Sequence, residues 1–231
     1  PLEKVPAAQK LIIEEAILHG TPVITATQML RTMVKESRPT RAEVSDVFTA
    51  VRDGTDAVML SDETAVGAHP IESVMILDRI CTEAEREIPK GLVNPAGVTH
   101  ESTNVADSIC YAACNAVAKL GASAILVCTH SGKSAKLMAK YRPRFPLIAV
   151  TEDLRARDRM SLVWGVEPLA IDLEEEVTTD EEVLTALLAA RDQYGLKPGA
   201  VTPDATRNSR GAVKHSALSW LCRDSLSDCP C

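Results

Sequence analysis

Three polar residues in the first third of the chain are spaced so that they could act together in proton transfer. Thr27 directly follows an apolar run, Val23–Ala26. Ser61 and Glu63 follow a second apolar run, Ala57–Leu60. A hydroxyl at a strand end can hydrogen-bond a substrate or a relaying water, and a buried glutamate is a suitable proton-relay group. The pattern predicts an enzyme-like site, although each hydroxyl could instead satisfy only its own strand end.

The stretch between the two apolar runs predicts the element that brings these residues together. Pro39 and Thr40 start a helical pattern that stops at Gly54. Two strands joined by a helix form a βαβ unit with parallel strands and a right-handed connection. In parallel α/β architectures chemistry lies at the carboxyl ends of the strands, and Thr27, Ser61 and Glu63 all occupy such positions.

Four sequence segments in this region resemble the pyruvate kinases. They are ATQML, PTRAEVSDV, DGTDAVMLS and ETAVGAHP, at residues 26–30, 39–47, 53–61 and 63–70. Each segment alone is weak, but four in this order within about fifty residues are specific, and the resemblance runs from Pro1 to about Gly199. It implies phosphoryl transfer from phosphoenolpyruvate to ADP with Mg²⁺ and K⁺, on a (β/α)8 barrel that carries a separate C-terminal α/β domain.

The expected fold is therefore α/β, with the last part of a TIM (β/α)8 barrel followed by a three-layer αβα domain. Residues 1–88 are predicted to form the barrel segment and residues 89–103 a linker. Residues 104–199 are predicted to form the α/β effector-binding domain, and residues 200–231 an aberrant, disordered tail. Two strands cannot close a barrel and would leave open edges. The chain also starts without Met or an apolar leader, so we expect preceding barrel strands in a longer protein. A shifted reading frame could explain the tail.

The resemblance implies catalytic roles for Thr27, Ser61 and Glu63, which would line the substrate pocket and its proton network. Asp62 stands where the family has Gly. A glycine there indicates a position that needs a permissive backbone conformation. The Asp62 carboxylate would also add a second negative charge near Glu63 and disturb the pocket. The Lys that stabilises the transferring phosphoryl group and the ligands of Mg²⁺ and K⁺ are implied upstream of Pro1. No metal ligand is assigned within this chain.

A second candidate site is the segment THSGKSA, which lies between a predicted strand and a predicted helix. Amide groups at a helix start, with hydroxyls and a lysine, suit a phosphate. Val127 occupies the first Gly position of a P-loop, so the nucleotide-binding motif fails. The resemblance implies a sugar-phosphate or AMP effector instead, bound by Thr129, His130, Ser131, Gly132, Lys133 and Ser134. The alternative is a tight turn with a serine cap.

Arg38 directly precedes the PTRAE segment and Arg41 lies within it. The counterpart of this segment in the family meets a neighbouring subunit of a tetramer. The alternative is a charged helix start with local caps, and both can hold. Further along, an acidic stretch precedes the last predicted helix, which Thr179 or Asp180 could cap. In the first predicted helix, Leu11, Ile12 and Leu18 belong to the stripe expected to be buried.

Composition narrows the class of protein further. The net charge of −7 argues against a nucleic-acid-binding surface. No apolar run reaches the ~20 residues of a membrane span. The seven cysteines show no metal-binding spacing. Cys81, Cys110, Cys114 and Cys128 are expected to be buried free thiols, which fits a cytoplasmic compartment, and the other three lie in the tail.

The leading interpretation is the C-terminal part of a pyruvate kinase, an allosteric, glycolytic phosphotransferase, expected to be inactive as this isolated fragment. Its partners would be phosphoenolpyruvate or pyruvate, ADP or ATP, an effector and further copies of the chain, without nucleic acid or membrane. One alternative is a non-catalytic module that binds a phosphate ligand. The other is a non-functional gene fragment.

Overall fold

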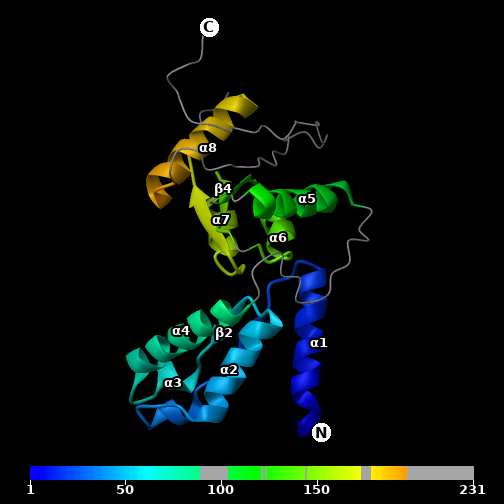
Figure 1. Ribbon diagram of the computed structural model, residues 1–231. Coiled ribbons are helices and arrows are strands. Elements are labelled where there is room, and N and C mark those ends of the chain that lie inside the picture. Colours follow the sequence, from blue (N-terminus) through cyan, green and yellow to red (C-terminus); the bar gives the residue numbers. More distant parts are fainter. Residues whose placement is uncertain (89–103, 121, 123, 144, 173–177, 197–231) are drawn as a thin grey trace. The chain divides into compact units, whose positions relative to one another are not determined.

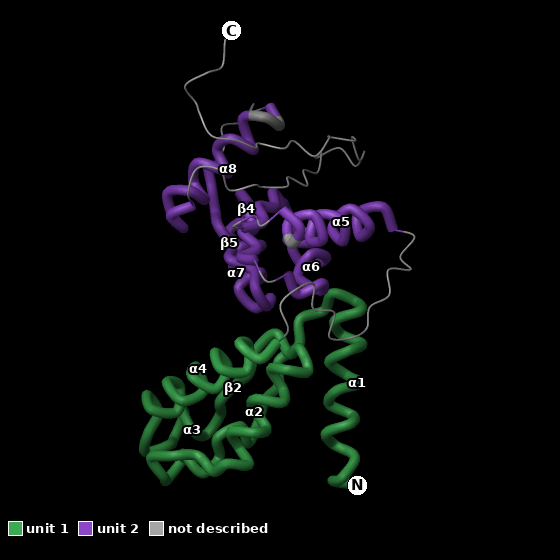
Figure 2. Tube along the Cα trace, in the orientation of Figure 1, with its two compact units in different colours: residues 1–98 green, residues 99–231 purple. Residues whose placement is uncertain are grey.

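Helices alternate with parallel strands along the chain in this computed structural model (Figure 1). The structure describes residues 1–88, 104–120, 122, 124–143, 145–172 and 178–196. The chain divides into two compact units, Pro1–Val98 and Thr99–Cys231 (Figure 2). The predicted linker and the predicted tail lie outside the described residues, and the predicted domain boundaries stay predictions.

Unit 1 is built around a short parallel strand pair. Its elements are η1 (Leu2–Lys4), α1 (Val5–Leu18), β1 (Ile24–Ala26), η2 (Arg31–Val34), α2 (Arg41–Asp53), β2 (Ala57–Met59), α3 (Asp62–Ala65) and α4 (Pro70–Glu87). β1 and β2 pair in parallel, with Ile24 opposite Ala57 and Ala26 opposite Met59. The predicted βαβ unit is confirmed.

Helix α2 begins and ends for reasons that are visible in its sequence. The Thr40 side chain accepts a hydrogen bond from the Glu43 amide, and the Glu43 carboxylate accepts one from the Thr40 amide, which completes a capping box. Gly54 ends the helix in the left-handed conformation, with φ of 101°. Glycine adopts that conformation without steric cost.

The core of unit 1 lies where α2 and α4 pack on each other and on the turn after β1 (Figure 1). Leu30 and Met33 from that turn are completely buried, as is Val47 of α2, and Ile80 of α4 is buried beside them. The connection after β1 is therefore a part of the core and not a surface loop.

The predicted buried stripe of α1 is wrong at three positions. Leu11 and Ile12 are 61% and 63% exposed, and Leu18 is also exposed. The buried side chains are Ile13 and Ile17, one helical turn apart. Within the described residues α1 packs mainly against α2, and a single neighbour covers only a narrow face of a helix.

Unit 2 contains a three-stranded parallel sheet in the order β3-β4-β5. Its elements are α5 (Val105–Leu120), β3 (Ile125–Cys128), α6 (Lys133–Ala139), β4 (Leu147–Thr151), α7 (Leu154–Met160), β5 (Val166–Ala170) and α8 (Thr179–Tyr194). Every residue of β3 and β4 is buried, so both faces of these strands are covered. The predicted three-layer α/β architecture is confirmed.

Helix α8 covers one face of this sheet. Its Ala186 and Ala190 are completely buried in a cluster that includes Leu126 of β3 and Ile148 of β4. The helix starts one residue before the predicted position, because Thr178 is its cap and forms a capping box with Glu181.

Candidate functional site

The register of β1 and β2 brings the ends of the two strands to the same edge. Ala26 lies opposite Met59, so Thr27 and Ser61 follow the strands on one side of unit 1. Thr27 is exposed and Ser61 is half-buried. The structure thus brings together the segments that carry the three residues singled out from the sequence.

The backbone immediately after β1 is strained. Thr27 has φ of 71° and Gln28 has φ of 57°, both in the left-handed region. The β-branched Thr27 is a true outlier there, and two consecutive residues in this region persist only where surrounding structure holds them. Such strain gathers at functional sites. Gln28 was not among the residues singled out from the sequence, although its place in the ATQML motif could have indicated it.

Glu63 is the most deeply buried charged side chain among the described residues of unit 1, with 1% exposure. Its Oε1 accepts a hydrogen bond from the Leu30 amide at 3.1 Å, and its Oε2 accepts one from the Ser61 amide at 2.8 Å. The carboxylate therefore joins the turn after β1 to the end of β2. Ser61 takes part through its backbone amide in this contact.

Asp62 does not require the backbone freedom that a glycine would supply. It begins α3, and it is not among the described non-glycine residues with positive φ. Its carboxylate forms an ion pair with Arg31 of η2. The expectation of a conformational conflict at this position is wrong, because the residue starts a helix. The extra negative charge has a cationic neighbour.

Glu43 is a buried carboxylate that the sequence reasoning placed only in the interface segment. Its Oε1 accepts from the Thr32 amide at 2.7 Å, and its Oε2 accepts from the Thr32 hydroxyl at 2.5 Å and from the Thr40 amide at 2.7 Å. Burial alone would raise the pKa of Glu43, but the hydrogen bonds from Thr32 and Thr40 outweigh it and lower the pKa below its usual value. The charged form is therefore the one that fits this site.

Arg41 begins α2 and Arg38 lies just before the Thr40 cap, both with exposed side chains. Glu43, two residues further along, points into unit 1 instead. The PTRAE segment thus combines an exposed basic face with an internal carboxylate.

In unit 2 the turn between β3 and α6 gathers the second set of predicted residues. The Thr129 side chain is buried, and its Oγ accepts a hydrogen bond from the Gly132 amide at 3.1 Å. Gly132 has φ of 77° and begins α6 without a side-chain cap, so the alternative of a serine cap is wrong. His130, Ser131 and Lys133 are exposed. Ser134 is half-buried.

Gly132 is required by contact as well as by conformation. A Cβ at this position would lie 2.8 Å from Cγ of Met160, a completely buried residue of α7. Gly165 has a similar φ of 71°, yet a Cβ there would meet nothing within 4 Å. The two glycines therefore share the conformational requirement, and only Gly132 adds a steric one.

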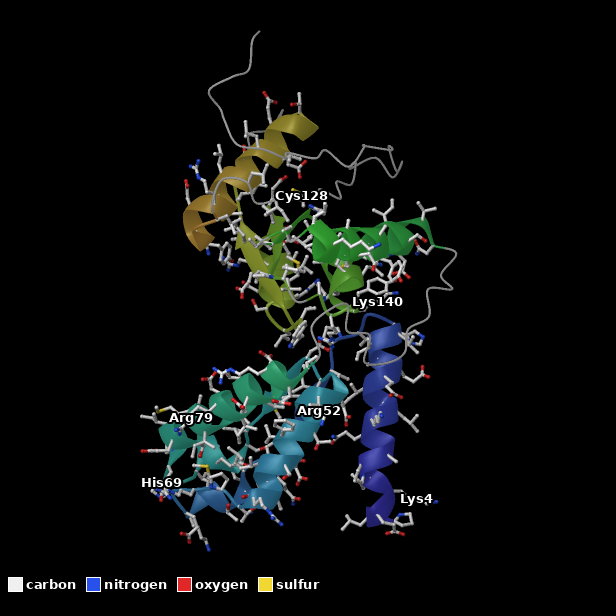
Figure 3. All side chains as sticks on the ribbon, in the orientation of Figure 1. Lys4, Arg52, His69, Arg79, Cys128 and Lys140 are labelled. Atoms are coloured by element: carbon white, nitrogen blue, oxygen red, sulfur yellow. The ribbon has the colours of Figure 1, made fainter. Side chains whose placement is uncertain are left out.

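A buried polar network joins α5 to the end of α6. The Lys140 ammonium lies 2.7 Å from the Asp107 carboxylate, and the Tyr141 hydroxyl donates to the same carboxylate at 2.8 Å. Figure 3 labels Lys140 at the end of α6. Burial, followed by the contact with Asp107, raises the pKa of Tyr141 well above its usual value. No sequence pattern indicated this network.

The two thiols of α5 have low reactivity. Burial is the main cause that raises the pKa of Cys110 and of Cys114 to about 12 each. A thiol with such a pKa stays protonated at neutral pH and is a poor nucleophile. Cys110, Cys114 and Cys128 are buried free thiols, as predicted, whereas Cys81 is a free thiol that is only half-buried.

Within the described part of the chain, no group of three or more His, Cys, Asp or Glu side chains is placed to hold a metal ion. None of its helices is long and apolar enough to cross a membrane. The residues at hand therefore do not fit a metal site.

The fold and the strand-end site define a parallel α/β protein of the enzyme type. Residues 1–74 match the family model described as "Pyruvate kinase, barrel domain". Residues 107–206 match "Pyruvate kinase, alpha/beta domain", seven residues beyond the end of the resemblance seen in the sequence. The chain belongs to the pyruvate kinase family.

Individual relatives agree with the family models. The pyruvate kinase of Clostridium acetobutylicum is 44% identical over 189 residues, which cover 81% of this chain and 39% of that protein. The enzyme of Geobacillus stearothermophilus is 41% identical over 196 residues, covering 85% and 33%. A crystal structure of a pyruvate kinase from Cryptosporidium parvum matches with a TM-score of 0.82 and 34% identity, covering 89% and 42%. The chain thus spans about two fifths or less of these relatives.

Proposed function

We propose that this chain supplies the proton-handling side of a pyruvate kinase active site, in which phosphoryl transfer from phosphoenolpyruvate to ADP yields pyruvate and ATP. The observation that carries the proposal is the strained pair Thr27 and Gln28, which lies shortly before Leu30, the residue whose amide donates to the buried Glu63. Strain of this kind is kept where a site needs a preorganised geometry. The family assignment supports the choice of reaction.

In this proposal each residue has a distinct task. The Thr27 hydroxyl, exposed at the end of β1, would hydrogen-bond the substrate or the water that delivers a proton to the enolate. Glu63 and Ser61 would hold the pocket wall through the contacts between the two strand ends. Mg²⁺ and K⁺ belong to the proposed reaction, and the described residues of this chain offer no group of three or more His, Cys, Asp or Glu side chains to hold them.

The proposal is tested by completing the barrel with a relative. Residues 1–196 of this chain replace the matching part of the Geobacillus stearothermophilus enzyme, and pyruvate formation is followed with lactate dehydrogenase. We expect turnover by the chimera and none by the isolated chain. Thr27→Val, which keeps the β-branched shape but lacks the hydroxyl, should lower kcat by about 10²-fold or more.

Thr49→Val is the matched control, because Thr49 lies exposed on α2, away from the strand ends. It should leave kcat unchanged. A Thr27→Val chimera with the turnover of its parent would contradict the proposed role of the hydroxyl. A folded parent chimera without any turnover would contradict the proposed function itself.

We also propose that the turn between β3 and α6 binds the phosphate of an effector, a sugar phosphate or AMP. The support is the tight turn held by Thr129 and Gly132, next to the exposed Lys133. Calorimetric titration with fructose bisphosphate, ribose phosphate and AMP should give heat for one of them. Gly132→Ala should abolish that heat, and Gly165→Ala should preserve it, because only the first crowds Met160. No heat with any ligand would leave the turn a structural one.

Assembly and location remain part of the proposal. Arg38 and Arg41 would face a neighbouring subunit of a homotetramer, and their exposure at the start of α2 supports this role. A glycolytic enzyme of this family would work in the cytoplasm.

A further inference from the structure

We infer that Glu43 is a positioning residue, which holds the segment after β1 so that Thr27 and Gln28 keep their strained backbone. The inference rests on the proposed function for the task of Thr27. It gives a role to a carboxylate at the start of α2, which the proposed function leaves without a task. The anchored segment is defined as Leu30–Thr32.

Three carboxylates hold the three consecutive residues of the anchored segment. They come from the start of α2 and from α3, and each contacts a different residue. The pairs are Leu30 with Glu63, Arg31 with Asp62, and Thr32 with Glu43. Glu43 makes the double contact, because it accepts from both the amide and the hydroxyl of Thr32.

This anchoring leaves the strained residues little freedom. Ala26 is fixed by its pairing with Met59, and only residues 27–29 separate it from the anchored segment. Leu30 is also completely buried in the core of unit 1. A short connection with both ends fixed can keep a conformation that a free chain would abandon. Loss of one anchor should therefore relax Thr27 and Gln28.

A comparison within the chain separates this role from ordinary helix capping. Glu43 and Glu181 occupy the same position in two capping boxes, with Thr40 and Thr178 as the caps. Glu181 is exposed and its side chain bonds Thr178, whereas Glu43 is buried and also bonds Thr32. The contact with Thr32 is more than the cap requires.

The test uses the full chain and amide resonances of Thr27 and Gln28, with hydrogen exchange of residues 27–34. Glu43→Gln should shift both resonances and speed exchange there by about tenfold or more. Glu181→Gln, the matched capping-box control, should change only the start of α8. Thr32→Val, which keeps the cap, should reproduce the effect of Glu43→Gln. Thr32→Ser, which keeps the hydroxyl, should resemble the parent.

Each outcome decides the inference. Unchanged resonances of Thr27 and Gln28 in Thr32→Val, with protection of α2 retained, would overturn it. If Glu43→Gln unfolds unit 1, Thr32→Val alone decides, because the capping box stays intact. The measurement needs no turnover, so an inactive chimera would refute the proposed function and leave the positioning role to be judged by the resonances.

Discussion

Glu63→Ala is expected to destabilise unit 1 by about 2–4 kcal/mol. The Glu63 carboxylate accepts the amides of Leu30 and Ser61, and its removal leaves both donors without this acceptor next to a buried core. An unsatisfied buried donor costs about 1–3 kcal/mol. Neither tryptophan lies in unit 1, so unfolding is best followed by hydrogen exchange of α2 and α4 at increasing urea concentration.

Two further variants test whether the loss of stability comes from the Glu63 carboxylate. Glu63→Gln keeps the shape and one acceptor, so its effect should lie between those of the parent and the alanine variant. Glu87→Ala, at the exposed end of α4, should change stability by less than about 0.5 kcal/mol. Equal exchange in Glu63→Ala and Glu87→Ala would show that the carboxylate does not hold the strand ends together.

Asp107→Ala is expected to have the larger effect in unit 2, a loss of about 3–5 kcal/mol. The substitution leaves the Lys140 ammonium buried without its carboxylate and the Tyr141 hydroxyl without its acceptor. Breaking a buried pair by removing one charge is costly, because the remaining charge cannot return to water. Both tryptophans of the chain lie in unit 2, so urea unfolding followed by tryptophan fluorescence reports on this unit.

The matched comparison removes the whole network at once. A triple variant, Asp107→Leu with Lys140→Met and Tyr141→Phe, removes the buried pair and the tyrosine hydroxyl together and should recover most of the loss. Asp158→Ala, which breaks an exposed pair with Arg157, should be almost neutral. A triple variant less stable than Asp107→Ala would mean that packing shape, and not the buried charge, dominates at this site.

The strand–helix alternation was predictable from the sequence because its signals are local. Apolar runs such as Ala57–Met59 and stop signals such as Gly54 act within a few residues, and the structure has β2 and the end of α2 there. The capping box of α2 likewise lies within four residues. The cap of α8 was placed one or two residues late, at Thr179 or Asp180, because Thr178 and these two neighbours offer similar capping signals.

Burial on a helix was harder to predict, because it depends on what packs against each face. Leu11 and Ile12 look like core residues by type, yet Ile13 and Ile17 are the buried ones. The residue types of a helix do not specify the side on which a neighbouring helix packs.

By itself the sequence determined the family, the parallel α/β architecture and the strand ends that carry Thr27, Ser61 and Glu63. Only the tertiary structure decided how these residues are held. The left-handed backbone of Thr27 is a conformation that its residue type does not dictate. The ion pair of Asp62 with Arg31 and the contact of Glu43 with Thr32 join residues that are separated in the chain. Such contacts depend on where whole elements pack, and local spacing cannot encode them.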